Sequence, residues 1–245
     1  MGIIATLLLC LALIVFALGL AARIWRYSRI PAPLKIPTMP APLTKGGAAL
    51  RLLRETVFFE SLFKATRWTW VFAWMFHAGL FIVVLAHLRY FTQPVWGWVA
   101  LISPYSTHAA IMMMVGLTGL LLRRVIIARV RYISTPSDYL MLLLLLLLAA
   151  SGLTLRYVYY TDILAVRQSV ISLLQLQFYA LPSDFILILH VTLVSILLLV
   201  FPFSKLLHAP GLFFSPSRNQ VDNSREKRHV NPWSDVAANN RKRGS

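Results

Sequence analysis

The sequence predicts an all-α membrane protein, a bundle of five transmembrane helices with its N-terminus outside and its C-terminus in the cytoplasm. Apolar residues make up 58% of the chain and the mean hydropathy is +0.71, a balance that a water-soluble fold hides poorly. Five stretches approach the twenty or so apolar residues that a hydrocarbon core of about 30 Å demands, and lipid favours helices over open sheets. These spans are 3–22, 69–91, 107–127, 138–157 and 184–207.

The distribution of positive charge predicts the orientation. Of the 24 Lys and Arg residues, all but Arg89, Arg156 and Arg167 lie in 23–67, in 123–131, or from Lys205 onward. Basic loops stay in the cytoplasm, so these segments are expected inside and the N-terminus outside. The same distribution explains the net charge of +16 as a topological signal, and we therefore expect no nucleic-acid partner.

The first two predicted segments are a transmembrane helix, 1–22, and a basic cytoplasmic loop, 23–67. The helix is expected to be retained, because no positive region precedes it and Arg23, Arg26 and Arg29 follow it. In the loop, a proline-rich run precedes an amphipathic helix within 48–66. Two compatible roles are open for that helix: it lies on the anionic inner leaflet, or it docks a soluble partner.

The rest of the chain is predicted to be a four-helix haem-binding core, 68–208, and a basic cytoplasmic tail, 209–245. The tail has too few apolar residues to fold alone, so it is either ordered against another subunit or disordered. His229 in this tail is expected to be solvated or to face a partner. The single cysteine, Cys10, excludes a cysteine-rich iron–sulfur site in this chain, and any such cluster is expected in a partner.

Four histidines lie in two of the apolar segments. His77 and His87 are ten residues apart and His190 and His208 are eighteen apart. Ionisable residues in lipid usually have a function, although each could instead hydrogen-bond within the bundle. The two segments run in opposite directions, which puts His77 at the depth of His208 and His87 at that of His190, nearer the outside. Imidazole is a good iron ligand and facing helices often hold cofactors, so two haems are predicted.

The two histidine spacings do not match in ideal helices. They correspond to axial separations of about 15 Å and about 27 Å. Pro202 lies between His190 and His208 and is predicted to kink a continuous fifth helix, which would absorb part of the difference.

The motifs around these histidines resemble those of a known family, the gamma subunit of respiratory nitrate reductase, a five-helix dihaem b-type cytochrome. The resemblance implies that His77 and His208 bind the iron of an inner haem b, and that His87 and His190 bind that of an outer one. It covers about residues 65–210. The matching runs are Phe76-His77-Ala78-Gly79, Ala86-His87, Gln93-Pro94, Arg123-Arg124 with Asp138, and Phe201-Pro202-Phe203-Ser204-Lys205-Leu206-Leu207-His208.

Two segments differ from the nitrate reductase subunit. The loop 23–67 and the tail from Arg218 to Trp233 look more like DsrM, the membrane cytochrome of the complex linked to dissimilatory sulfite reductase. This likeness implies a cytoplasmic iron–sulfur partner similar to heterodisulfide reductase, further membrane or extracytoplasmic subunits, and a place in sulfur metabolism. It also implies the cytoplasmic (inner) membrane of a bacterium or archaeon.

The chain also differs from the nitrate reductase subunit at the quinol pocket. The family has a lysine near the start of the third helix, where this chain reads Ser106-Thr107-His108. His108 could accept a proton from quinol, since imidazole titrates near neutrality, or it could be an interfacial residue at the helix start. Arg89 could pair with a haem propionate, line the quinone pocket, or simply extend toward the membrane surface.

Together these features predict the quinone-reactive electron-transfer subunit of an oxidoreductase complex. A quinone or quinol reacts near the outer haem, and the cytoplasmic iron–sulfur partner exchanges electrons at the inner haem. One alternative keeps the cytochrome but places it in a nitrate reductase-, hydrogenase- or formate dehydrogenase-type complex. Another is a membrane anchor or transporter without haem, although the spans show no pair of broken helices typical of a transport site.

Overall fold

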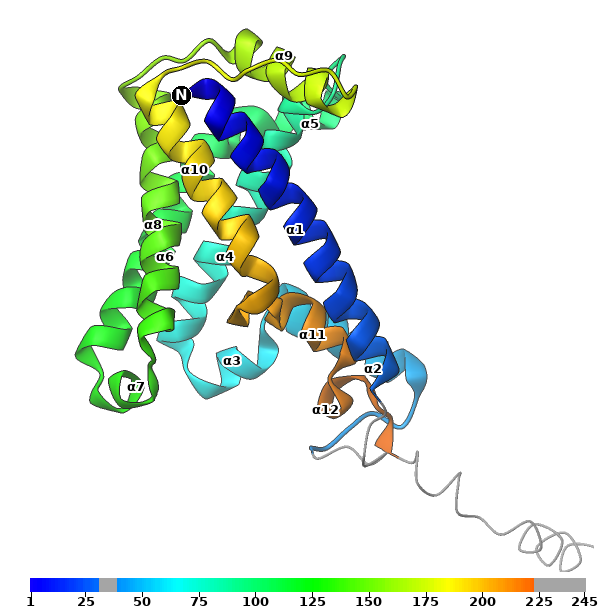
Figure 1. Ribbon diagram of the computed structural model, residues 1–245. Coiled ribbons are helices and arrows are strands. Elements are labelled where there is room, and N and C mark those ends of the chain that lie inside the picture. Colours follow the sequence, from blue (N-terminus) through cyan, green and yellow to red (C-terminus); the bar gives the residue numbers. More distant parts are fainter. Residues whose placement is uncertain (31–38, 223–245) are drawn as a thin grey trace, which may run out of the picture. The chain divides into compact units, whose positions relative to one another are not determined.

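A computed structural model of the chain describes residues 1–30 and 39–222, and within them it contains helices and no strands (Figure 1). Five helical runs are long and apolar enough to cross a membrane, which confirms the predicted all-α architecture. His229 and the Asn231-Pro232-Trp233 run lie outside the described residues. The five runs are Gly2–Arg29, Arg67–Tyr90, Gly97–Ile126, Pro136–Tyr157 and Phe185–Phe203.

The chain divides into two compact units. The first contains Met1–Gly19 and Ser61–Phe203, and the second contains Leu20–Glu60 and Ser204–Ser245. Helix α1 (Gly2–Arg29) therefore contributes its first part to one unit and its last part to the other. The predicted cytoplasmic loop and the predicted tail fall largely in the second unit.

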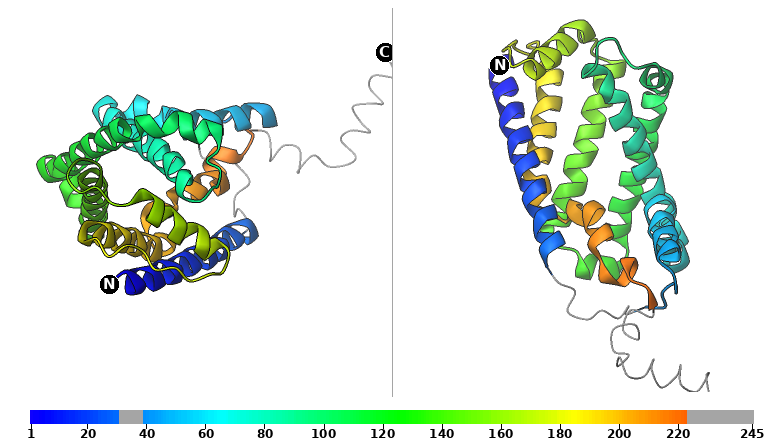
Figure 2. Two further views of the ribbon diagram at one scale, coloured as in Figure 1. Left: turned by 90° about the horizontal axis from the view of Figure 1, so that it is seen from above. Right: turned by 90° about the vertical axis from the view of Figure 1, so that its right-hand side faces the viewer.

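In the first unit, consecutive long helices pack as neighbours. Helix α4 packs along α6, α6 against α8, and α8 against α10, and the view along the bundle shows the resulting arc (Figure 2). The first part of α1 lies beside α10, where Phe16 and Phe201 meet edge to face at 5.2 Å. The elements are α4 (Arg67–His87), η1 (Leu88–Tyr90), α5 (Gly97–Ile102), η2 (Ser103–Tyr105), α6 (Ser106–Ile126), α7 (Ala128–Ile133), α8 (Pro136–Tyr157), α9 (Ile163–Leu174) and α10 (Phe185–Val200), preceded at the boundary between the units by α3 (Glu60–Ala65).

Glycines set the register between α4 and α6. A Cβ on Gly116 would lie 2.6 Å from the carbonyl oxygen of Phe72, and a Cβ on Gly79 would lie 2.5 Å from that of Ala109. Small residues allow this close backbone approach, which supplies much of the packing between helices in lipid. Buried residues of α4, α6 and α8 fill the adjoining core: Phe76, Met113, Leu117, Leu145 and Ala149.

The outward faces of these helices are apolar. Leu7, Phe81 and Leu140 have exposed fractions of 55%, 65% and 65%. In water such a surface would drive association, whereas hydrocarbon is its natural surrounding. The exposed apolar faces therefore agree with the five predicted spans.

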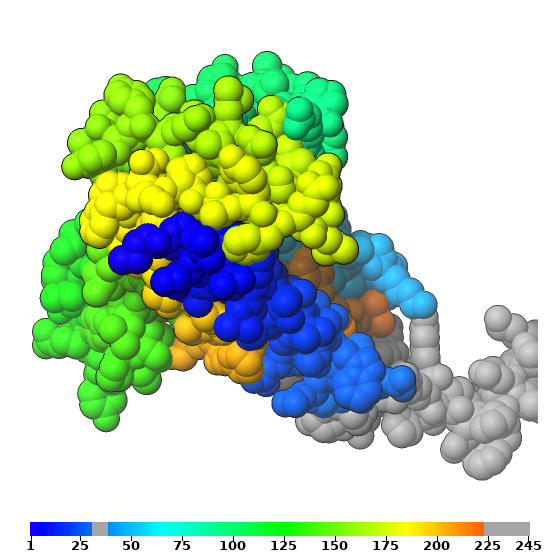
Figure 3. Space-filling view, turned by 45° about the horizontal axis from the view of Figure 1, so that its top comes forward, coloured from blue at the N-terminus to red at the C-terminus, as the bar shows by residue number. Residues whose placement is uncertain are grey.

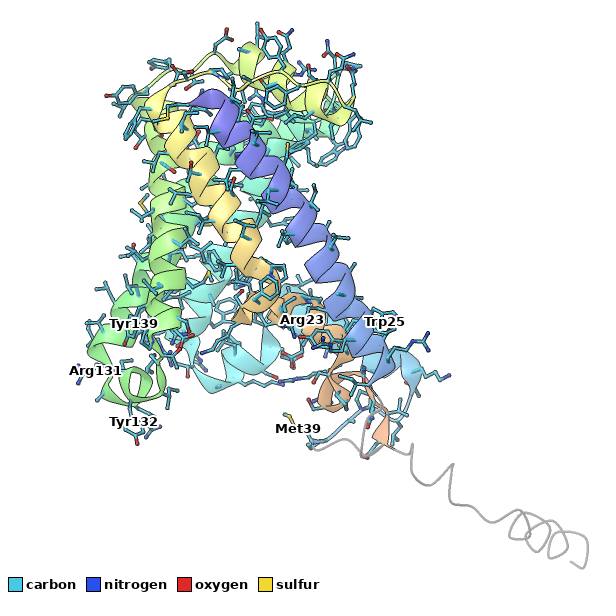
Figure 4. All side chains as sticks on the ribbon, in the orientation of Figure 1. Arg23, Trp25, Met39, Arg131, Tyr132 and Tyr139 are labelled. Atoms are coloured by element: carbon cyan, nitrogen blue, oxygen red, sulfur yellow. The ribbon has the colours of Figure 1, made fainter. Side chains whose placement is uncertain are left out.

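The basic loop between α6 and α8 is held by α8's first turn (Figure 4). A capping box of Thr135 and Asp138 starts α8, and Arg124 Nη1 lies 3.9 Å from an Asp138 carboxylate oxygen. The Tyr139 hydroxyl donates to the Arg124 carbonyl at 3.2 Å, while Arg131 and Tyr132 lie exposed on α7. The charged loop is thus folded back on the end of its own helix pair.

The fifth span ends earlier than predicted. Helix α10 stops at Val200, and η3 (Phe201–Phe203) and an extended Ser204 (φ −106°, ψ 173°) separate it from η4 (Lys205–Leu207) and α11 (His208–Phe214). Proline has no N–H to donate and crowds the preceding turn, and the Ser204 hydroxyl then accepts from Leu206 N at 3.2 Å. Pro202 therefore ends the helix rather than kinking it, so the predicted single helix over 184–207 and its 27 Å separation do not apply.

The second unit joins segments from both ends of the chain. Helix α2 (Lys45–Val57) contacts α12 (Pro216–Asn219), where Arg218 Nη1 donates to a Glu55 carboxylate oxygen at 2.6 Å. Asp222 N also donates to the Pro42 carbonyl at 3.1 Å. The described start of the predicted tail is therefore folded against the predicted loop.

Candidate functional site

His87 and His190 meet in the first unit. His87 is the last residue of α4, and His190 lies in the second turn of α10. Their imidazole rings are nearly parallel, with an interplanar angle of 18° and 6.5 Å between centroids. The two residues are 103 positions apart in sequence, and their rings lie side by side in the folded chain.

Hydrogen bonds define the tautomer of both rings. His87 Nδ1 lies 2.7 Å from the Val83 carbonyl, which can only accept, so Nδ1 carries the proton. His190 Nδ1 lies 2.9 Å from the Ser151 hydroxyl, which itself donates to the Leu148 carbonyl at 2.9 Å and accepts from the imidazole. In both histidines the lone pair is therefore on Nε2, the form in which imidazole binds a metal.

This geometry fits one iron ion held between two imidazoles. Rings that coordinate a metal from opposite sides through nitrogens at about 2 Å have centroids roughly 6 Å apart. Among the described residues no group of three or more His, Cys, Asp or Glu side chains gathers as a metal site. A haem needs only two axial ligands, since its own four nitrogens complete the coordination, so the residues fit haem better than a bare metal ion.

Helix α8 supplies two residues that the sequence reasoning missed. Ser151 orients His190, as described, and Gly152 lies against the same ring: a Cβ there would be 3.3 Å from His190 Cε1. The only signal in the sequence is a Ser-Gly pair within an otherwise apolar run, which many transmembrane helices contain. Only the packing of α8 on α10 identifies them.

His77 and His208 show the same tautomer pattern separately. His77 Nδ1 lies 2.7 Å from the Ala73 carbonyl on α4, and its ring contacts that of Phe76 at 4.6 Å. His208 Nδ1 lies 3.0 Å from the Lys205 carbonyl at the start of α11. Since each carbonyl can only accept, the proton is again on Nδ1. His77 belongs to the first unit and His208 to the second, and their pairing stays a prediction.

His108 lies deeper than the start of its span. Helix α6 begins at Ser106, but α5 and η2 extend the helical run outward to Gly97. The glycine contacts between α4 and α6 place His108 level with about residue 83, roughly 6 Å inward of His87. His108 is also exposed, and it lies eleven residues after Gly97, the first residue of this helical run.

Arg89 follows His87 in η1. Its guanidinium lies over the Tyr90 ring at 5.8 Å, and the Tyr90 ring lies 5.8 Å from that of His87. This arrangement keeps a positive charge at the C-terminal end of α4, close to the histidine pair. Within the described residues, no carboxylate forms an ion pair with it.

Comparisons with known proteins agree with the resemblance seen in the sequence motifs. The family model described as nitrate reductase gamma subunit matches residues 60–219. The Hdr-like menaquinol oxidoreductase cytochrome b-like subunit of Archaeoglobus fulgidus is 34% identical over 268 residues, covering 91% of this chain and 81% of that protein. The subunit of the same name from Archaeoglobus profundus is 33% identical, covering 89% of this chain and 79% of that protein.

Proposed function

Because the chain belongs to the nitrate reductase gamma subunit family, we propose that it is a dihaem b-type cytochrome linking a membrane quinone pool to a cytoplasmic iron–sulfur partner. One observation carries the proposal: the His87 and His190 imidazoles are nearly parallel, 6.5 Å apart, and both are protonated on Nδ1. Two histidines so prepared within an apolar bundle suit axial ligation of one iron. The anchor and transporter alternatives offer no reason for that arrangement.

At the outer site, the chain's own residues hold and orient the haem ligands. His87 and His190 would bind the iron through Nε2, while the Val83 carbonyl and the Ser151 hydroxyl keep each ring in place. Hydrogen bonds to Nδ1 also raise the basicity of the ligand and so influence the reduction potential. The haem supplies reversible one-electron chemistry when bound.

Quinol oxidation also requires a proton acceptor, and His108 is our candidate. It is exposed on the apolar surface of α6, about 6 Å inward of His87, where a lipid-dissolved quinol can reach it. Neutral imidazole can take the hydroxyl proton as the electron leaves. The two similar proteins named as menaquinol oxidoreductase subunits support menaquinol as the donor, and Arg89 is a second candidate for this pocket.

At the inner site, His77 and His208 are the proposed ligands of the second haem. The positive-inside rule favours the cytoplasmic side for this end, and the membrane that we propose is the cytoplasmic (inner) membrane of a bacterium or archaeon. The Hdr-like names of the similar proteins support an iron–sulfur partner resembling heterodisulfide reductase. The loop 23–67 and the tail from Arg218 to Trp233 resemble those of DsrM. On this basis we also propose further membrane or extracytoplasmic subunits and a role in sulfur metabolism.

The test uses the full chain purified from membranes together with whatever copurifies. Two haem b per chain, low-spin spectra, and reduction of both haems by a menaquinol analogue are expected. A folded preparation without haem would refute the proposal. Mass spectrometry of the copurified subunits separates an iron–sulfur, heterodisulfide reductase-like partner from a molybdenum enzyme, a hydrogenase or a formate dehydrogenase.

A further inference from the structure

Helix α9 is a short helix at the outer end of the first unit. Asp162 caps it, its carboxylate accepting from Leu164 N at 2.9 Å and Ala165 N at 3.2 Å. It packs against η1, the turn that directly follows His87, and the space-filling view shows the α9 region covering this end (Figure 3). One side of α9 therefore faces the end of α4 that carries His87.

Helix α9 carries exposed leucines and one buried hydroxyl. Ser169 is fully buried and bonded to the Ala165 and Ala180 carbonyls, whereas Leu164 and Leu174 have exposed fractions of 73% and 61%. A helix on a water-soluble surface would place its leucines inside and its polar groups outside. The exposed leucines suit the lipid interface.

Arg167 is the charged residue of α9, and as it lies two positions before Ser169 it is on a different side of the helix. One guanidinium nitrogen donates to the Thr92 carbonyl at 2.7 Å, but its buried Nε has no hydrogen-bond partner among the described residues. No described carboxylate forms an ion pair with it. A buried donor left without a partner is costly, and an arginine near the membrane surface can usually extend its head group to water. The guanidinium beside Thr92 therefore has a donor available for a further acceptor.

We propose that Arg167 binds a propionate carboxylate of the outer haem. Thr92, which the guanidinium contacts, is five residues beyond His87 and directly follows the η1 turn and Phe91. Haem b carries two carboxylates on one edge, and among the described residues three arginines at this end of the unit, Arg89, Arg156 and Arg167, form no ion pair with a carboxylate; of these, Arg167 has the guanidinium that contacts Thr92. The planar guanidinium matches a carboxylate with two parallel hydrogen bonds. This inference rests on the proposed dihaem function.

In this role Arg167 is a positioning residue that also tunes the outer haem. A fixed positive charge near the macrocycle favours the electron-rich reduced form. Its removal should lower the outer haem's reduction potential and leave the inner haem unchanged, which makes the inner haem an internal reference.

The test is a redox titration of the full chain, with its copurifying subunits, in nanodiscs of zwitterionic lipid. Arg167→Gln keeps a donor for the Thr92 carbonyl but removes the charge, Arg167→Met removes both, and Arg167→Lys restores the charge. Arg156→Gln is the matched control, because Arg156 is an exposed arginine in the last turn of α8. We expect the Gln and Met variants to lower the outer haem's reduction equilibrium constant up to about tenfold, which is about 59 mV for one electron. The Lys variant should stay near wild type.

Several results would distinguish propionate binding by Arg167 from other roles of this residue. Selective loss of the outer haem in the Gln and Met variants, with both haems retained in the Lys variant, would also support the assignment. Unchanged reduction potentials in the Gln and Met variants would overturn the assignment. A changed potential in the Met variant alone would also overturn it, because it would show that Arg167 only holds the Thr92 carbonyl by a hydrogen bond. Loss of both haems in all three variants would do the same. An effect confined to nanodiscs of anionic lipid would assign the guanidinium to a lipid head group instead. Wild-type protein without an outer haem would refute the dihaem function itself, before any variant is compared.

Discussion

The outer and inner histidine pairs are built differently. His87 and His190 lie in one compact unit, where the successive packing of α4, α6, α8 and α10 brings them to 6.5 Å. His77 belongs to that unit, but His208 starts α11 in the other, beyond the break at Pro202 and Ser204. The outer pair is therefore positioned by a single folded core, whereas the proposed inner pair draws one ligand from each unit.

Because of this difference, the two proposed haem sites should depend on different parts of the chain. The outer ligands are ordered by the helices themselves and by Ser151, so that site should depend only on the first unit. The proposed inner site additionally depends on contacts that hold the second unit together, among them the Arg218–Glu55 ion pair. Variants can therefore be chosen that affect one site and leave the other intact.

Replacing the histidines should give the largest effect. His87→Ala and His190→Ala should each remove the outer haem and leave the inner one, because a single imidazole no longer holds the iron from both sides. His77→Ala and His208→Ala should remove the inner haem instead. Pyridine haemochrome content, with redox titration of the remaining haem, measures this, and each variant should fall from two haems to one.

His108→Ala is the matched control for these four, because His108 is an intramembrane histidine that we place in quinol oxidation rather than in ligation. It should keep both haems and lose menaquinol-driven reduction. If His87→Ala and His77→Ala removed the same haem, the pairing would be wrong. A haem lost from the His108 variant would make that residue a ligand or a support of one.

Some features of the two histidine pairs can be predicted from the sequence, and others cannot. The spans, the basic loops and the shared depth of His87 and His190 follow from composition, charge and helical rise, which are additive along the chain. The end of α10 does not: a proline near a helix end either kinks or terminates it, depending on whether neighbouring groups such as the Ser204 hydroxyl satisfy the freed backbone. The sequence also did not reveal the roles of Ser151, Gly152 and Arg167. These residue types are common, and only the packing of the helices shows what they contact.

The next largest effect is expected from Ser151→Ala. This change removes the hydroxyl that accepts from His190 Nδ1 and should weaken retention of the outer haem by about ten- to a hundredfold, the usual range for a group that orients a metal ligand. Haem transfer to apomyoglobin measures the rate of loss for each haem. Ser195→Ala is the control, since Ser195 is equally buried on α10 but bonds to the Val191 carbonyl. Equal loss from both variants would mean that Ser151 contributes only general packing.

A local effect should come from the second unit and should appear at the inner haem alone. Arg218→Ala removes a charge-assisted hydrogen bond to a Glu55 side chain that is only 10% exposed, a loss of about 1.5–3 kcal/mol. The temperature at which the inner haem is released should fall, while the outer haem's release temperature stays unchanged. Arg54→Ala removes an exposed arginine from the same α2 helix and should change neither. A fall in both release temperatures would show that the second unit stabilises both haem sites. The outer site would then not depend on the first unit alone.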